Sequence, residues 1–258
     1  MSGEPDSIPL FSMNPTGRFS DRADDYVSYR PDYPAAAVDA VLEGLGEAAA
    51  LTAADIGAGT GISARQLADR GVRVIAVEPN AAMREAATPH ARVEWRDGSA
   101  EATGLAAESL ELLTSFQAFH WFRPREAVAE FRRVLRPGAR LALIWNVRDD
   151  RDALTRGYVE AIRVVAGRPL AERRELEPGV LDGAGLFARP RVLTFSHLQR
   201  LDARGLLGRA ASASYVPKEP AALARLGRLL AELHARHHDA EGFVQLRYLT
   251  DVHLARAL

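Results

Sequence analysis

The sequence contains no cysteine, and Lys218 is its only lysine. The absence of cysteine excludes disulfide bonds, thiolate metal sites and cysteine nucleophiles. A chain without disulfides fits a cytoplasmic protein, so we predict that location. Arginine supplies nearly all of the positive charge, alongside abundant alanine, a bias that indicates a GC-rich bacterial genome.

Long apolar segments and a large net charge are also missing. The longest useful apolar run, residues 141–147, is far too short to span a bilayer, and the polar, proline-broken N-terminus has no apolar signal core. The net charge of −1 gives no broad basic field. We therefore expect no membrane and no nucleic-acid partner. A chain of 258 residues suits one sizeable core with a modest lid, as a monomer or homodimer.

Short apolar segments alternate with amphipathic ones along the first two thirds of the chain. We expect strands at 51–56, 72–77, 91–95, 110–116 and 139–147, and helices at 35–45, 62–70, 79–87 and 124–135. Repeated βαβ units of this size imply a parallel sheet with helices on both faces. Later strands at 191–197 and 243–254, with helices at 151–166, 201–214 and 221–238, would complete the sheet. The predicted fold is α/β and Rossmann-like, with a seven-stranded mostly parallel sheet, an N-terminal helical cap and a late helical insert.

This pattern predicts a single domain behind a short tail. Residues 1–18 are rich in Ser, Pro and Gly and are expected to form a flexible tail. The domain at 19–258 would comprise an N-terminal cap (19–46), a cofactor-binding core (47–150), and a substrate lid with the closing strands (151–258).

A glycine-rich loop follows the first expected strand, in the segment Asp55-Ile56-Gly57-Ala58-Gly59-Thr60-Gly61. Glycines let the backbone turn sharply and let a ligand approach closely, and the following helix offers its N–H groups. A dinucleotide fingerprint requires G-x-G-x-x-G, but here Ile62 occupies the third glycine's place. The spacing therefore favours S-adenosylmethionine over NAD, with a ligand-free glycine turn as the simpler alternative.

Glu78 stands directly after the second expected strand. Ligands of open parallel sheets bind at the carboxyl edge, and a carboxylate there can accept hydrogen bonds from both ribose hydroxyls. A surface glutamate that starts a helix is the alternative. Two further loops reach this edge, Arg96 to Glu101 beside the expected adenine pocket and Ser115 to Phe122 facing the methyl donor.

Taken together, these motifs resemble class I S-adenosylmethionine-dependent methyltransferases, in the bacterial small-molecule group that includes the ubiquinone/menaquinone and trans-aconitate methyltransferases. The resemblance covers roughly residues 19–150. It is carried by Phe19 to Tyr26, Tyr29-Arg30-Pro31, Asp55 to Gly61, Glu78-Pro79-Asn80 with Met83, Gly98 to Glu101, Gln117 to Phe122, and Val134 to Gly138. It indicates fold and cofactor but not the substrate.

The resemblance implies a role for each matching residue. Gly57, Gly59 and Gly61 would line the methionine moiety, Glu78 would hold the ribose, and Ser99 and Ala100 would contact the adenine edge. The remaining residues of the implied cofactor set are Tyr26, Arg30, Asp55, Ala58, Pro79, Met83 and Gln117. Within this set Arg30 would pair with the methionine carboxylate and Tyr26 would fold over the cofactor. Many relatives carry an acidic residue where Ser99 stands, so the sequence departs from the family pattern at this position.

Methyl transfer is an in-line displacement that depends mainly on alignment and the exclusion of water. His120 is the candidate general base because its ordinary pKa, near ~6.5, suits proton abstraction. Packing between Phe119 and Trp121 is the alternative role for His120. No metal is expected, since His237-His238-Asp239 has no third ligand at a suitable spacing.

The expected partner is a small-molecule acceptor, methylated at O, N or C, in specialised metabolism. Candidate acceptor residues are Tyr29, Trp121, Trp145, Asn146 and Tyr158, with core packing an equal explanation for Trp145. Ser212, Ser214 and Tyr215 could belong to a lid or to a capping turn. Two other functions stay open: an S-adenosylmethionine-binding enzyme of different chemistry, and a cofactor-binding regulatory protein.

Overall fold

The computed structural model describes residues 29–167, 176–213 and 215–258. The expected tail at 1–18, Tyr26 and Ser214 lie outside the described residues. The described elements are, in chain order, α2 (Ala35–Leu42), η3 (Ala48–Ala50), β1 (Thr52–Ile56), α3 (Ile62–Ala68), β2 (Arg73–Val77), α4 (Ala81–Glu85), β3 (Val93–Arg96), β4 (Leu110–Phe116), η4 (Phe119–Trp121), α5 (Pro124–Val134), β5 (Leu135–Arg148), α6 (Ala153–Ala166), β6 (Arg191–Leu201), α7 (Ala203–Ala211), α8 (Pro220–His237) and β7 (Val244–Arg256).

The strands form one seven-stranded sheet in the order β3-β2-β1-β4-β5-β7-β6. The five strands from β3 to β5 pair in parallel, and β7 runs antiparallel to both of its neighbours, β5 and β6. This arrangement confirms the predicted Rossmann-like, mostly parallel sheet. The order reverses between β1 and β4, which places the topological switch point at the ends of these two strands.

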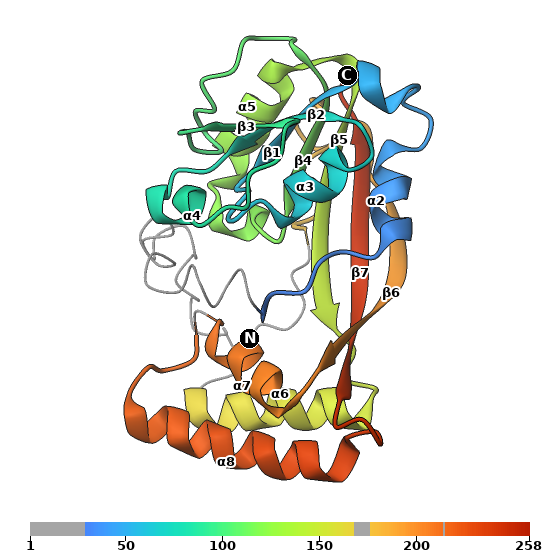
Figure 1. Cartoon of the computed structure of the whole chain (residues 1–258). Coiled ribbons are helices and arrows are strands. Elements are labelled where there is room, and N and C mark those ends of the chain that lie inside the picture. The colour runs from blue at the N-terminus through green and yellow to red at the C-terminus, as the bar shows by residue number, and fades with distance from the viewer. Residues whose placement is uncertain (1–28, 168–175, 214) are drawn as a thin grey trace, which may run out of the picture.

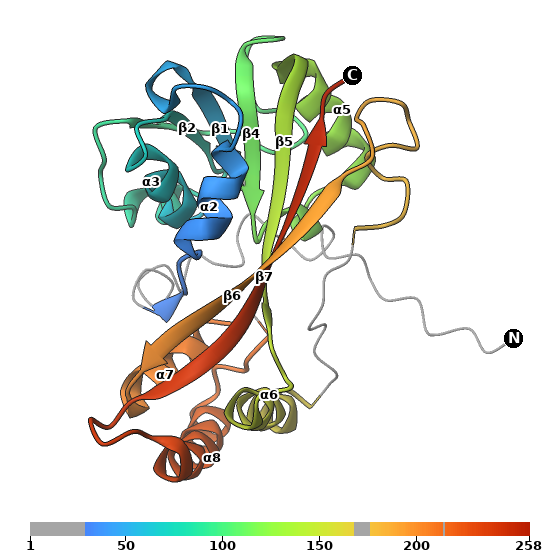
Figure 2. The ribbon, with the colours of Figure 1, turned by 90° about the vertical axis from the view of Figure 1, so that its right-hand side faces the viewer.

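Helices cover both faces of the sheet (Figure 2). On one face α2 and α3 bury Val38 and Leu67 in an apolar cluster with the sheet. On the other face α5 buries Phe131 and Val128. Apolar residues therefore face helices on both sides of the central strands, as a parallel sheet requires.

A third apolar cluster lies at the far ends of β6 and β7. These two strands form a long ribbon that leaves the main sheet and reaches the layer of α6, α7 and α8 (Figure 1). Tyr158 of α6, Leu206 of α7 and Leu230 of α8 pack there against Leu246 and Tyr248 of β7. The segment expected to hold a lid and the closing strands therefore has an apolar cluster of its own.

Local signals fix several helix starts. Proline occupies the first turn of α5 and α8, where its missing N–H costs nothing. Asp152 caps α6 by accepting a hydrogen bond from the N–H of Thr155, at 2.9 Å. Asp202 caps α7 by accepting one from the N–H of Gly205, at 2.6 Å.

Two expected strand boundaries were wrong by four residues. The strand predicted to begin at Ala139 begins at Leu135 and includes Pro137 and Gly138, because α5 ends at Val134 and a register shift between Leu110 and Leu112 accommodates the proline. The strand predicted to end at His197 continues to Leu201 because β7 pairs with it along its whole length. No helix in the described ranges is both long enough and apolar enough to cross a bilayer.

The buried ring of Phe131 gives a direct test of this packing. It has no exposed surface, and its centroid lies 6.3 Å from those of Phe119 and Phe122. We expect Phe131→Ala to lower the free energy of unfolding by about 3–5 kcal/mol, because the sheet and α5 cannot close the cavity. Urea denaturation measures the loss. Arg125→Ala, at an exposed position of the same helix, should stay within about 0.5 kcal/mol of the parent, and equal losses in both variants would contradict the predicted packing.

Candidate functional site

The glycine loop joins β1 to α3 at the switch point. Gly57, Gly59 and Gly61 have φ values of 70°, 59° and 77°, in the left-handed region that favours glycine. A Cβ on Gly57 would lie 2.7 Å from the Cβ of Ala118, and one on Gly61 would lie 2.8 Å from the ring of Trp95. The loop conformation and the close approach of its neighbours therefore both require glycine.

Glu78 is buried at the end of β2, beside this loop. Its Oε2 accepts a hydrogen bond from the N–H of Gly59 at 2.9 Å, and its Oε1 accepts one from the N–H of Asn80 at 3.0 Å. Burial raises the pKa of the carboxyl, and these two hydrogen bonds oppose the rise. Two of about four acceptor positions are used, so the oxygens keep capacity for further donors such as ribose hydroxyls.

Asp55, at the end of β1, is fully buried beneath the loop. Its Oδ2 accepts a hydrogen bond from the Ser63 hydroxyl at 2.6 Å, and its Oδ1 accepts one from the Thr114 hydroxyl at 2.9 Å. Burial raises the pKa of Asp55 to about 6, against the effect of both hydroxyls. The side chain thus links β1 to α3 and β4.

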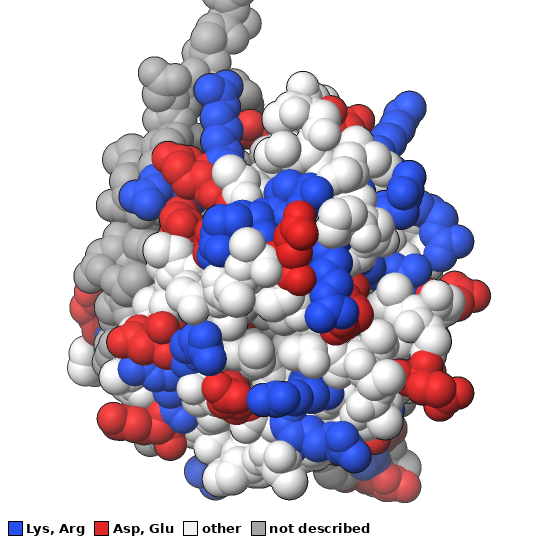
Figure 3. All heavy atoms as spheres, turned by 90° about the horizontal axis from the view of Figure 1, so that it is seen from above, with Lys and Arg blue, Asp and Glu red and all other residues white. Residues whose placement is uncertain are grey.

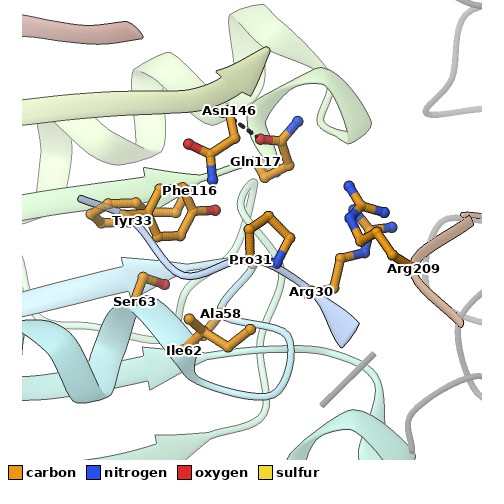
Figure 4. A pocket seen from close by; sticks show the side chains of 11 residues that line it. Arg30, Pro31, Tyr33, Ala58, Ile62, Ser63, Phe116, Gln117, Asn146 and Arg209 are labelled. Atoms are coloured by element: carbon orange, nitrogen blue, oxygen red, sulfur yellow. Dashed lines mark hydrogen bonds between the residues drawn. The ribbon is translucent and has the colours of Figure 1, made fainter. Parts of the chain in front are cut away.

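A pocket opens between the glycine loop and the end of β4 (Figure 4). Its walls come from the N-terminal segment, the β1 and β4 ends, α3, β5 and α7. The lining residues are Arg30, Pro31, Tyr33, Gly57, Ala58, Ile62, Ser63, Phe116, Gln117, Asn146 and Arg209. Five residues predicted from the sequence therefore meet here: Arg30, Gly57, Ala58, Gln117 and Asn146.

Gln117 and Asn146 are fixed relative to each other in this wall. Gln117 has a φ of 54°, and its Oε1 accepts a hydrogen bond from the N–H of Asn146 at 2.8 Å. The Asn146 side chain donates to the carbonyl of Asp32 at 3.0 Å and accepts from the Thr250 hydroxyl at 2.6 Å. A strained, non-glycine residue held by such bonds at a sheet edge is typical of a binding site.

His120 and Trp145 lie together outside the residues that line the pocket. The indole N–H of Trp145 donates to Nδ1 of His120 at 3.2 Å, and Trp145 is buried in the core. Because an indole N–H can only donate, a neutral His120 ring carries its proton on Nε2. The ring would have to release Trp145 before Nδ1 could accept a proton. This contact favours packing for His120, and its role as a base stays a prediction.

The other predicted residues lie around the site at varying depth. Met83 and Ala100 are buried, and Ser99 pairs with Ala102 in a short bridge next to them. Pro79 and Trp121 are half-buried. These placements leave the predicted adenine contacts untested.

Two predicted acceptor residues lie toward the helical layer. The ring of Tyr29 packs so closely on α7 that a Cβ on Gly208 would lie 2.4 Å from it. Tyr158 lies in the third apolar cluster, fully buried. The hydroxyl of Ser212 donates to the carbonyl of Arg209 at 2.9 Å, as in the capping turn that was the alternative to a lid.

Ser63, Tyr33 and Arg209 line the pocket but were missed in the sequence. For Arg209 a signal exists, because Gly205, Leu206, Arg209 and Ala210 share the buried side of α7. An arginine on the apolar side of a short helix is unusual enough to mark a functional residue.

Comparison with known proteins agrees with this geometry. Residues 54–143 match the family model described as "Methyltransferase domain". Over 146 residues the chain is 40% identical to the uncharacterized methyltransferase Rv3342 of Mycobacterium tuberculosis (strain H37Rv), covering 55% of this chain and 56% of that protein. The ubiquinone/menaquinone biosynthesis C-methyltransferase UbiE of Rubrivivax gelatinosus is 42% identical over 89 residues, 33% of this chain and 36% of its own length.

A solved structure extends the comparison to most of the chain. A protein from Anaeromyxobacter dehalogenans, described as a putative type II methyltransferase, superposes with a TM-score of 0.64 at 26% identity, covering 89% of this chain and 97% of that one. The matched segment and the superposed structure confirm the resemblance to class I S-adenosylmethionine-dependent methyltransferases that the sequence predicts. The chain matches little more than half the length of the Mycobacterium relatives.

The raised pKa of Asp55 predicts a pH dependence of stability. The folded-state pKa of about 6 exceeds the unfolded value of about 3.9, so the folded protein binds the proton more tightly. The favourable contribution of Asp55 is therefore complete below about pH 4 and is lost as the pH rises through 6. We expect Asp55→Asn to gain stability relative to the parent between pH 4 and pH 7, by at most about 3 kcal/mol.

Urea unfolding at four pH values across this window measures the difference. Asp182→Asn, at an exposed position, is the control and should run parallel to the parent. A parallel profile for Asp55→Asn as well would show that Asp55 does not titrate with the raised pKa.

Proposed function

We propose that the protein transfers the methyl group of S-adenosylmethionine to a small-molecule acceptor. The observation that carries this proposal is the position of Glu78, bonded to the N–H of Gly59 beside a pocket at the switch point of the sheet. Open α/β sheets bind their ligands at this point. The glycines leave room where a Cβ would collide, and the Glu78 oxygens retain acceptor capacity, so the residues present fit the cofactor.

Each part of the site has a separate task in this function. Glu78 would accept hydrogen bonds from the ribose hydroxyls, and the glycine loop would pass along the methionine moiety. Arg30, which lines the pocket, would pair with the methionine carboxylate. When bound, the cofactor supplies a methyl group on a positively charged sulfur, which is already activated for displacement.

The remaining work of the chain is alignment. The rigid wall of Gln117 and Asn146 would hold the acceptor in line and keep water away from it. Alignment of this kind can supply about 7–11 kcal/mol of the barrier. Because the Trp145 bond occupies Nδ1 of His120, a mechanism without a dedicated base is the simpler proposal for an acceptor that is already a good nucleophile.

The surface supports a small acceptor rather than a nucleic acid. On the face seen in Figure 3, Lys and Arg are interspersed with Asp and Glu, with both signs across the view. The net charge is −1. A nucleic-acid partner would call for a basic stripe or patch. The cytoplasmic location and the monomeric or dimeric state stay predictions.

Replacement of Glu78 tests the cofactor assignment. We expect Glu78→Gln to weaken the affinity for S-adenosylmethionine at least tenfold, about 1.4 kcal/mol, because the amide lacks the charge and half of the acceptors that the ribose would use. Glu78→Ala should weaken it further. Titration calorimetry measures both affinities, and circular dichroism checks that the fold is kept.

The matched control is Glu85→Gln, at an exposed position of α4, which should bind as the parent does. Unchanged affinity in a folded Glu78→Gln protein would refute the ribose assignment.

A further inference from the structure

Three arginines gather between the pocket and the helical layer, from segments far apart in the sequence. Arg30 belongs to the N-terminal segment, Arg148 ends β5, and Arg209 lies on α7. Arg30 and Arg209 both line the pocket, and Figure 4 shows their side chains at the same end of it. Arg148 and Arg209 interact electrostatically, and all three act on Tyr215. We call these three side chains the arginine cluster.

Arg209 is the most deeply buried member, with 5% of its surface exposed. Its Nε donates to the hydroxyl of Tyr248 at 3.2 Å, but its Nη1 is buried and has no hydrogen-bond partner among the described residues. The groups that act on its charge, within the part of the chain that the structure describes, are three tyrosines and Arg148. None of them is a carboxylate.

Tyrosine hydroxyls surround the cluster. Tyr215 accepts a hydrogen bond from Nη2 of Arg148 at 2.6 Å, and the Arg148 guanidinium lies 5.3 Å from the ring centroid of Tyr158. The Tyr158 hydroxyl is buried and has no partner among the described residues. Burial tends to raise the pKa of Tyr215, but Arg148 and Arg209 outweigh burial and lower the pKa, as expected in a positive local potential.

A buried guanidinium group whose N–H donates to no acceptor is unfavourable unless an anion accepts that hydrogen bond. Buried charges in proteins are paired, because the free energy lost on removing a charge from water exceeds the free energy gained from weak contacts. Arginine is suited to carboxylate and phosphate, whose oxygens match its planar donors. Since Arg209 lines the same pocket as Gly57 and Gln117, an anion bound to it would lie at the edge of the proposed methyl-transfer site.

We propose that Arg148 and Arg209 of the arginine cluster, together with the Tyr158 hydroxyl, bind an anionic group, a carboxylate or a phosphate, of the methyl acceptor. This inference rests on the proposed function and specifies its substrate class. The cluster anchors one end of the acceptor at the helical layer, and the rest of the acceptor extends along the Gln117 and Asn146 wall toward the glycine loop. Arg30, at the same end of the pocket as Arg209, would pair with the methionine carboxylate of the cofactor.

The test uses the full-length protein saturated with S-adenosylhomocysteine, titrated by calorimetry with benzoate, citrate, inorganic phosphate and inorganic diphosphate. Benzamide is the neutral counterpart of benzoate. We expect at least one anion to bind the parent protein and to bind Arg209→Met at least tenfold more weakly, with the affinity for S-adenosylhomocysteine unchanged within twofold. Comparison of the two carboxylates, benzoate and citrate, with phosphate and diphosphate shows which of the two anionic groups the site binds.

Two further variants keep the result interpretable. Arg204→Met removes an exposed arginine from the same helix and should bind anions as the parent does. Tyr158→Phe removes a hydroxyl that has no described partner, so it should fold normally and weaken anion binding about threefold or more. It therefore tests the site even if Arg209→Met fails to fold.

Three results would overturn the proposal. Anions that bind the parent and Arg209→Met equally would be adventitious. Loss of S-adenosylhomocysteine affinity in Arg209→Met would place Arg209 on the cofactor instead. No binding of any of the four anions to the cofactor-saturated parent would exclude an anion site. Failure of the parent to bind S-adenosylhomocysteine at all is a separate result, which refutes the proposed function.

Discussion

Glu78 accepts hydrogen bonds from the N–H groups of Gly59 and Asn80, and through them one buried carboxylate couples the glycine loop to the start of α4. The loop can accept this arrangement because its glycines adopt left-handed φ values. Asp55, two residues before the loop, links β1 to α3 and β4 through Ser63 and Thr114. The two carboxylates therefore set the shape of the cofactor side of the site.

The negative and positive groups of the site come from different parts of the fold. Asp55 and Glu78 are buried at the ends of β1 and β2, whereas Arg30 and Arg209 line one end of the pocket (Figure 4). A ligand with a positive centre and an anionic end is complementary to such a separation. The helical layer of α6, α7 and α8 thus contributes more than packing, because it supplies the cationic end of a pocket whose other end belongs to the sheet.

Much of the fold was predicted from the local sequence pattern, and the predictions that were wrong have physical causes. The strand at Leu110–Phe116 was predicted with the right bounds because its apolar run lies between polar residues on both sides. The start of β5 was missed because proline and glycine are signals of a break. Leu135 nevertheless already pairs with Leu110 of β4, and the N–H of Gly138 donates to the carbonyl of Ala257. In the site, Gly57 and Gln117 were found from motifs. Arg209 was not, since its importance arises only when α7 is brought against β7 and the pocket.

The most direct measurement is calorimetric titration of the purified protein with S-adenosylmethionine, S-adenosylhomocysteine and NAD in parallel. Ile62 occupies the place of the third glycine of a dinucleotide loop, and Glu78 is held by hydrogen bonds from Gly59 and Asn80. We therefore predict that the protein binds the first two ligands and does not bind NAD. Binding of NAD alone would contradict the central claim that this pocket is built for a methyl donor.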